Sequence, residues 1–373
     1  MLNDYMGIIN LNEKEDKIKE LTYCRPIASI PFAGRYRLID FVLSNFVNAG
    51  IVNVGVFTQN KYRSLQDHLG NGKAWDLDRK NDGLFLNLPA FNYYTLGIYR
   101  GDIDNFKNHM SYIRMGKQHN VIISPSYMVC NIDYRKAAAY FEETGADITL
   151  ISNTNSRCGE EFQNCYTLNV GPDNEVLGIV ENTGRSEVCH VFIEMYIMKK
   201  TLLEDLIHTC ISKGDNDNLL DVIQKNIGKF KINTYRFDGT LACINSIQSY
   251  YRDNMKMFDL DYAEELFDRN GPIYTKVKDE PPVLYTDTAE VSNSFIANGC
   301  IIEGTVENSI IFRRVNIAKG ANIKNSIVMN NCIIEADAII RNVILDKNVT
   351  ITAGKQIKGD PNYPIVVEKG ARV

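Results

Sequence analysis

The sequence lacks several features that would point to particular classes of protein. It has no uninterrupted run of eighteen apolar residues and no apolar segment of the signal-peptide kind, so a membrane or secreted protein is not expected. Its formal net charge is −5 at pH 7, which argues against nucleic-acid binding because phosphate backbones attract an excess of lysine and arginine. We therefore expect a cytoplasmic protein that binds neither nucleic acid nor membrane.

The nine cysteines include no Cys-x-x-Cys pair, and their number is odd. A disulfide framework or a zinc-thiolate site normally shows paired, closely spaced cysteines. We therefore expect nine reduced thiols and no metal bound by cysteine.

The C-terminal part of the chain repeats with a fixed period. Aliphatic residues recur seventeen positions apart in three registers, namely Ile317, Ile334 and Ile351, then Ile323, Ile340 and Ile357, then Ile311, Val328 and Leu345. Three short strands per turn, each burying one aliphatic side chain, produce this pattern. It predicts a left-handed parallel β-helix of the hexapeptide type over residues 286–373, preceded by a helical linker over residues 251–285.

Solenoids of this kind include sugar acyltransferases that use a solenoid histidine as a base. The chain has five histidines, and all of them precede the solenoid: His68, His109, His119, His190 and His208. An acyltransferase is therefore a weak alternative.

The first 250 residues have the pattern of an α/β domain. Buried strands are predicted at residues 6–10, 51–57 and 120–124, and amphipathic helices at residues 38–47 and 201–212. We predict a Rossmann-like domain over residues 1–250. Its basic loop at residues 25–37 leads into a helix and a strand, which is how α/β sheets present groups that bind anions.

Two motifs resemble those of a known family. Residues 25–51 are similar to the signature R-A-K-P-A-V-P-F-G-G-K-[FY]-R-[IL]-I-D-F-x-L-S-N-x-x-N-S-G-I of ADP-glucose pyrophosphorylases, the glucose-1-phosphate adenylyltransferases of glycogen and starch synthesis. Residues 75–79, Trp-Asp-Leu-Asp-Arg, match a second signature of that family. The chain is therefore identified as a member, and the resemblance implies a nucleotidyltransferase domain followed by the solenoid.

Other positions depart from the family at the places where it binds phosphate. The glycine-rich loop after the first strand is absent, and Glu13, Glu15 and Asp16 stand there instead. Only glycine lets a backbone approach a triphosphate closely, so no phosphate cradle is expected. The alignment also places Ile27 and Asn182 at two lysines that the family uses to bind phosphate.

The family's metal-binding aspartates are missing too. One of them falls on Ser126 or Tyr127, depending on the end from which the slightly longer segment is counted. The second falls on Cys243, and Ala242 replaces a neighbouring glutamate. The resemblance therefore implies no catalytic residue and no metal in this chain.

These losses resemble the D-type subunit that accompanies the catalytic C-type subunit of the bacterial enzyme. We expect a regulatory and structural subunit of a heterotetramer, with Mg²⁺ held by the catalytic partner. The alternative is an active nucleotidyltransferase with displaced ligands, for which Asp102, Asp104 and Asp133 are the nearby carboxylates.

Three arginines of the basic loop are candidates for a regulatory site. Arg25 and Arg37 keep the family's arginines, and Arg35 lies between them. If the loop folds back at Pro31–Gly34, the two guanidinium groups can bind one phosphate or sugar phosphate effector. The competing interpretation is that these arginines form structural ion pairs.

Overall fold

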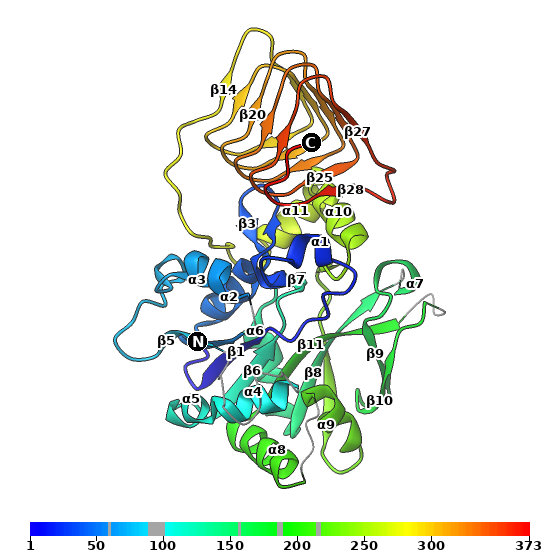
Figure 1. Ribbon diagram of the computed structural model, residues 1–373. Helices are drawn as coiled ribbons and strands as arrows, with labels where there is room; N and C mark the ends of the chain where they lie inside the picture. The colour runs from blue at the N-terminus through cyan, green and yellow to red at the C-terminus, as the bar shows by residue number, and fades with distance from the viewer. Residues whose placement is uncertain (59–60, 89–100, 156–157, 185–188, 214–217) are drawn as a thin grey trace. The chain divides into compact units, whose positions relative to one another are not determined.

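The computed structural model describes residues 1–58, 61–88, 101–155, 158–184, 189–213 and 218–373 (Figure 1). The chain forms two compact units, and neither is continuous in sequence. The sheet unit comprises Met1–Glu13, Ile39–Cys243 and Leu266–Tyr274, and the solenoid unit comprises Lys14–Leu38, Ile244–Glu265 and Thr275–Val373. Within the described residues, no helix has the length and apolarity needed to span a membrane.

The sheet unit is built on a mixed sheet whose main path runs β10-β9-β11-β6-β1-β4-β5, with β8 joining β11 and β12 off this path. The strands are β1 (Tyr5–Asn10), β4 (Asn53–Phe57), β5 (Gly83–Asn87), β6 (Asn120–Ser124), β8 (Ile148–Asn155), β9 (Tyr166–Val170), β10 (Val176–Glu181), β11 (Cys189–Lys199) and β12 (Ile232–Arg236). Strand β1 pairs in parallel with β4 and β6, so the three predicted strands lie side by side with their carboxyl ends at one edge.

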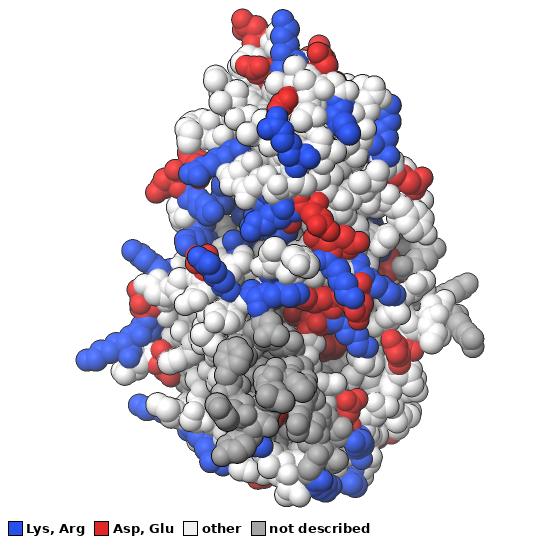
Figure 2. Space-filling view, viewed as in Figure 1, with Lys and Arg blue, Asp and Glu red and all other residues white. Residues whose placement is uncertain are grey.

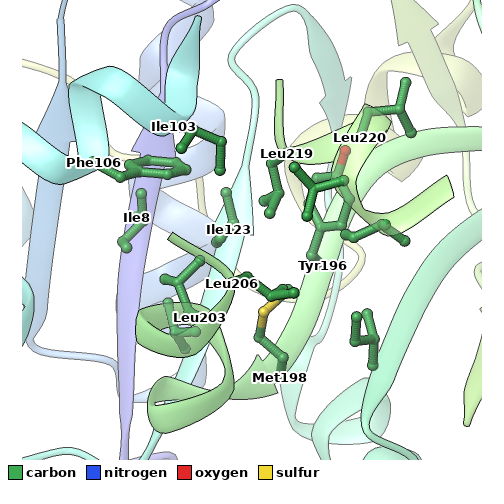
Figure 3. Close-up of a cluster of buried hydrophobic side chains, with 14 of the residues drawn as sticks. Ile8, Ile103, Phe106, Ile123, Tyr196, Met198, Leu203, Leu206, Leu219 and Leu220 are labelled. Atoms are coloured by element: carbon green, nitrogen blue, oxygen red, sulfur yellow. The ribbon is translucent and has the colours of Figure 1, made fainter. Parts of the chain in front are cut away.

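Helices accompany this sheet, namely α2 (Leu38–Ala49), α3 (Arg63–Leu69), α4 (Asp102–Asn108), α5 (Met110–Met115), α6 (Tyr134–Thr144), α7 (Cys158–Glu161), α8 (Lys200–Lys213) and α9 (Leu219–Lys225). The longer ones, such as α6 and α8, bury an apolar stripe. Figure 3 shows Ile103 and Phe106 of α4 and Leu203 and Leu206 of α8 in one cluster with strand residues such as Ile123. The predicted amphipathic helix at residues 201–212 is thus confirmed.

The solenoid unit contains three parallel sheets of five strands each. The first sheet is β14 (Leu284–Tyr285), β17 (Ile301–Ile302), β20 (Asn316–Ile317), β23 (Ile333–Ile334) and β26 (Thr350–Ile351). The second is β15 (Glu290–Ser292), β18 (Thr305–Glu307), β21 (Asn322–Lys324), β24 (Ile339–Arg341) and β27 (Gln356–Lys358). The third is β16 (Phe295–Ile296), β19 (Ile310–Ile311), β22 (Ile327–Val328), β25 (Val343–Leu345) and β28 (Ile365–Val367).

All three predicted registers are confirmed as rungs of these sheets. Ile317, Ile334 and Ile351 pair in succession, and the other two series do the same in their own sheets. The period differs at both ends of the solenoid: Ile296 pairs with Ile311 and Ile302 with Ile317, fifteen residues apart, and in the last coil Leu345 pairs with Val367. The extra residues form a turn in which the Asp360 and Tyr363 backbones bond to each other.

Asparagines form one corner of the solenoid. Asn308, Asn325 and Asn342 have φ angles of +46°, +48° and +51°, a left-handed conformation that asparagine tolerates better than most residues. The amide of Asn308 donates to Oδ1 of Asn325 at 2.7 Å, so the side chains also connect successive coils. Sequence analysis missed this role, although the seventeen-residue spacing of the three asparagines is visible in the sequence.

The division into units differs from the predicted boundaries at residues 250 and 285. Residues 14–38 belong to the solenoid unit, together with α1 (Lys19–Thr22), the 3₁₀ turn η1 (Ile27–Ser29), β2 (Pro31–Phe32), β3 (Tyr36–Arg37) and α10 (Ile247–Met255). The reason is a set of contacts between distant segments. Tyr250 Oη donates to the Pro31 carbonyl at 2.8 Å, and the Ala33 N–H donates to Asn254 Oδ1 at 3.0 Å.

Candidate functional site

The two positions that lost metal-binding aspartates lie next to each other in the sheet unit. Strand β7 (Met128–Cys130) pairs antiparallel with β13 (Leu241–Cys243), and Cys243 lies opposite Met128. Tyr127, Ala242 and Cys243 are all buried. The sequence prediction therefore identified residues that the fold brings together.

Side chains of the protein itself fill this place. Tyr127 Oη donates to Glu194 Oε1 at 2.5 Å, and the sulfurs of Cys165 and Cys243 lie 3.3 Å apart. Burial, and then the Glu194 carboxylate, raises the pKa of Tyr127 well above its usual value, so its phenol stays neutral and acts as a donor. Within the described residues, no group of three histidine, cysteine, aspartate or glutamate side chains is arranged to hold a metal ion.

Glu194 is a functional-site residue whose role sequence analysis missed. It lies in β11 where the register shifts between Phe192 and Met195, and its φ angle is +54°. A left-handed φ of this kind favours glycine, which has no Cβ to clash with the backbone. Here a glutamate adopts the strained conformation, and its carboxylate accepts the bond from Tyr127.

Glu13 belongs to the segment that replaces the family's glycine-rich phosphate loop, and it lies in the same unit. Ser126 donates to Glu13 Oε1 from both its backbone N–H and its hydroxyl, each at 2.6 Å. Ser126 follows the carboxyl end of β6 and is fully buried. An incoming phosphate would therefore meet a carboxylate that already uses these two donors. The carboxylate of Glu13 is thus present where the sequence places it, and its partner is Ser126.

The two positions of lost lysines are structural as well. Ile27 is buried in the turn η1 of the solenoid unit. The buried Asn182 amide donates to the carbonyls of Cys158 and Phe162, at 2.8 and 2.9 Å, and its Oδ1 accepts from the Gly184 N–H. Asn182 thus holds the α7 segment in place, and it carries no charge for a sugar phosphate.

Two of the three carboxylates that displaced-ligand catalysis would need, Asp102 and Asp133, have structural partners. Asp102 is buried and accepts from the Leu219 N–H and from the Asn10 amide, at 2.7 and 3.0 Å, and burial raises its pKa to about 7. Asp133 caps helix α6 and forms an ion pair with Arg135 at 2.8 Å. Asp104, in the first turn of α4, is only half-buried.

One cysteine pair contradicts the prediction of nine reduced thiols. Cys158 and Cys189 form a disulfide with a Cα–Cα distance of 6.0 Å. The cause is strand register, because Cys189 lies opposite Asn155 in the β8–β11 pairing and Cys158 follows three residues later. The two cysteines are 31 residues apart and belong to no cysteine motif, so the sequence does not indicate that they pair. The other seven cysteines, all within the described residues, are thiols.

The basic loop folds back as predicted, since β2 and β3 pair with Pro31 opposite Arg37. Arg25 is buried and has two structural partners. Its Nη2 lies 2.5 Å from Asp346 Oδ2, and its Nε donates to the Leu21 carbonyl. For Arg25 the structural ion pair is therefore observed. Arg37 is half-buried, and Arg35 is exposed beside the ring of Tyr36.

Two lysines that sequence analysis missed belong to the same region of the solenoid unit. Burial, and then the charges of Arg37 and Arg25, lower the pKa of the half-buried Lys347 to about 6, although the Asp346 carboxylate opposes this shift. The pKa of Lys278 is also lowered, first by partial burial of its ammonium group and then by Arg313 and Arg37, although the residue as a whole is exposed. We call Arg25, Arg37, Lys278 and Lys347 the cation cluster.

The cation cluster is a local feature. On the face drawn in Figure 2, basic and acidic side chains are interspersed, in keeping with the net charge of −5. A broad basic surface of the kind that binds nucleic acid is not visible on that face. The cluster can instead attract a small anion, because guanidinium and ammonium groups are donors suited to phosphate and sulfate oxygens.

Two family models match the chain. The model described as nucleotidyl transferase matches residues 16–242, and the model described as GlmU-like, C-terminal hexapeptide matches residues 284–364. Their order agrees with the two kinds of architecture in the fold.

Relatives match over nearly the whole length. The chain is 38% identical to the glycogen biosynthesis protein GlgD of Bacillus subtilis, over 99% of this chain and 96% of the relative. It is 40% identical to GlgD of Geobacillus stearothermophilus, over 99% and 97%. It is 33% identical to the glucose-1-phosphate adenylyltransferase of Thermomicrobium roseum, over 97% and 86%. This chain therefore belongs to the ADP-glucose pyrophosphorylase family, the glucose-1-phosphate adenylyltransferases, and it is similar to GlgD proteins over almost its entire length.

Proposed function

We propose that this chain is a regulatory and structural subunit of a glucose-1-phosphate adenylyltransferase complex in glycogen synthesis, with little or no catalytic activity of its own. The observation that carries this proposal is the buried contact set around Cys243 and Tyr127, where the family's second metal-binding aspartate falls on Cys243 and the first on Tyr127 or its neighbour Ser126. Adenylyl transfer needs a metal ion to neutralise charge on the phosphate oxygens. The contact between Glu13 and Ser126 adds a carboxylate where the nucleotide phosphates would lie.

The test is an assay of the purified chain alone with ATP, Mg²⁺ and glucose 1-phosphate. Losing several kcal/mol of metal stabilisation predicts turnover at least about a thousandfold below that of an active homologue, because each 1.4 kcal/mol corresponds to about tenfold. Turnover within tenfold of the homologue would contradict the proposal and favour the displaced-ligand enzyme.

The proposed partner is a catalytic homologue that holds Mg²⁺, in an assembly of four chains in the cytoplasm. The solenoid supports this because its first coil exposes apolar side chains, including Leu284, Tyr285 and Phe295, at an open strand edge. Co-expression with a catalytic homologue followed by size-exclusion chromatography tests the assembly. Elution of the two chains in separate peaks would contradict it.

The regulatory part of the proposal concerns the cation cluster. We propose that phosphate or a sugar phosphate binds there and favours one state of the complex over another. Arg37, Lys278 and Lys347 are each at least partly exposed, so solvent anions can reach them. Arg25 contributes its charge while its Nη2 stays bonded to Asp346.

A further inference from the structure

The disulfide between Cys158 and Cys189 has one accessible and one enclosed end. Cys158 is fully buried, whereas Cys189 is half-buried at the first position of β11. Thiol–disulfide exchange requires a thiolate to approach a sulfur atom, so access decides which sulfur reacts with an outside molecule. The geometry therefore favours Cys189 as the sulfur that meets solvent reagents.

The enclosed sulfur is held by a polar contact. Asn182 Nδ2 lies 3.3 Å from Cys158 Sγ, and because its two hydrogens are also directed at the carbonyls of Cys158 and Phe162, the sulfur shares one of them. An N–H group directed at sulfur favours the thiolate over the thiol, because a hydrogen bond to the charged form stabilises it. When the disulfide is open, the shared N–H partly offsets the burial that disfavours the Cys158 thiolate, and the position of Cys158 beside Cys189 makes it the attacking group in the second step.

We propose that Cys158 and Cys189 form a reversible thiol–disulfide site that reacts with low-molecular-weight disulfides such as oxidised glutathione. In the first step the Cys189 thiolate attacks one sulfur of glutathione disulfide, which forms a mixed disulfide and releases one glutathione thiolate. In the second step the Cys158 thiolate attacks the Cys189 sulfur and releases the second glutathione. The two cysteine thiols lose two electrons and two protons, and glutathione disulfide is reduced to two glutathione molecules.

A second cysteine pair in the same unit provides an internal control. The sulfurs of Cys165 and Cys243 lie 3.3 Å apart, yet both residues are at most 1% exposed. Close sulfurs without access are expected to remain thiols, since no reagent can form the mixed disulfide. The reactivity of the site is therefore attributed to the exposure of Cys189 as well as to the proximity of two sulfurs.

The experiment uses the full-length chain in buffers of defined ratios of reduced to oxidised glutathione. After equilibration, the protein is acid-quenched, denatured, alkylated and analysed by peptide mass spectrometry. In the most oxidising buffer we expect one linked peptide pair containing Cys158 and Cys189, a glutathione adduct on the exposed Cys24 and six alkylated cysteines, and in the most reducing buffer nine alkylated cysteines. This readout requires no partner, effector or enzymatic activity, so its outcome does not depend on the proposed function.

Two results would overturn the proposal. The first is nine alkylated cysteines in every buffer, which would mean that the bond does not form. The second is a Cys158–Cys189 bond that survives the most reducing buffer in the folded protein, which would make it a permanent structural bond. Preferential linkage of Cys165 to Cys243 would also contradict the role of access.

Single variants test the order of attack. In Cys158→Ser, Cys189 should accumulate as a mixed disulfide with glutathione, because the second thiolate is missing. In Cys189→Ser, the enclosed Cys158 should stay unmodified, and Cys165→Ser should form the native disulfide as wild type does. An adduct on Cys158 in Cys189→Ser, with none on Cys189 in Cys158→Ser, would reverse the assignment. Circular dichroism verifies that each variant is folded. If a variant is unfolded, the glutathione equilibration of the wild-type chain still tests the proposal.

Discussion

The degenerate site of the sheet unit and Lys347 of the cation cluster differ in how well the surrounding chain satisfies a polar group. In the sheet unit, the groups at the lost ligand positions bond to neighbours of the same chain, as Tyr127 does to Glu194 and Ser126 does to Glu13. In the solenoid unit, the neighbouring charges lower the pKa of Lys347 despite the Asp346 carboxylate beside it.

This difference distinguishes a site whose polar groups are bonded to other side chains from a site that can still bind an anion. A buried polar group with a good internal partner has little to gain from a ligand, because binding would first have to break an existing bond. A cation whose charged form is disfavoured gains when an anion arrives, since the anion offsets both burial and repulsion. Ligand binding is therefore expected at the cation cluster rather than at the former catalytic site.

The largest expected effect concerns catalysis. Restoring one carboxylate, in Cys243→Asp, should leave ADP-glucose synthesis at least about a thousandfold below that of an active homologue, because Glu13 and the missing lysines are unchanged and effects of cooperating groups are not additive. A pyrophosphate-release assay measures this, with Cys243→Ala as the matched control. Activity that rises above the control to within tenfold of the homologue would show that the filled site still binds metal.

The next largest effect is on stability, and it tests the buried ion pair between Arg25 and Asp346. Arg25→Ala should lower the free energy of unfolding by about 3–5 kcal/mol, because it leaves the Asp346 carboxylate buried without its ion-pair partner. Urea unfolding measures the change. Arg35→Ala is the matched control from the exposed part of the same loop, with an expected loss of about 0.5 kcal/mol or less. An equal decrease in the free energy of unfolding in both variants would show that the buried ion pair does not stabilise the fold more than an exposed arginine does.

The parts of the molecule that depend on local repetition or on resemblance could be predicted from the sequence. The registers of Ile317, Ile323 and Ile311 were visible because each coil repeats the same burial, and a fixed period of seventeen allows few other folds. The loss of ligand groups at Tyr127 and Cys243 was visible because the surrounding motif could be aligned.

The contacts that replace those groups could not be predicted. The partners Glu13 and Ser126 lie 113 residues apart, and Tyr127 and Glu194 lie 67 apart. Arg25 and Asp346 are separated by 321 residues. Such pairs follow from the complete fold and leave no periodic or compositional signal. The same holds for Lys278 and Lys347, which sequence analysis did not select.

A smaller effect is expected on regulation. Because Arg25 is structural, the better variant is the double substitution Arg37→Gln with Lys347→Gln. In the co-purified complex it should raise the half-maximal concentration of an activating phosphate or sugar phosphate about tenfold, as expected for the loss of about 1.4 kcal/mol of charged hydrogen bonding. The control is Lys319→Gln with Arg341→Gln, two exposed cations of the solenoid. A response curve identical to wild type would move the regulatory site elsewhere.

The smallest effect is a pH dependence of anion binding. Since the pKa of Lys347 falls from 10.5 to about 6 in the folded chain, the unfolded chain binds more protons between these values, and this lysine makes stability rise with pH across that window. A bound dianion favours the charged lysine, so it should stabilise the fold more near pH 6 than near pH 9. Sulfate is a suitable probe because it stays doubly charged throughout.

The measurement is the increase in Tm caused by sulfate at the two pH values, which should differ by a few degrees in wild type. Sulfate also stabilises proteins generally by its exclusion from their surface, and that part should be the same in Lys347→Met. The variant should therefore show a smaller increase that is equal at both pH values. If wild type and Lys347→Met respond alike at both, Lys347 does not sense the anion, and the contrast between the filled site and the cation cluster loses its energetic basis.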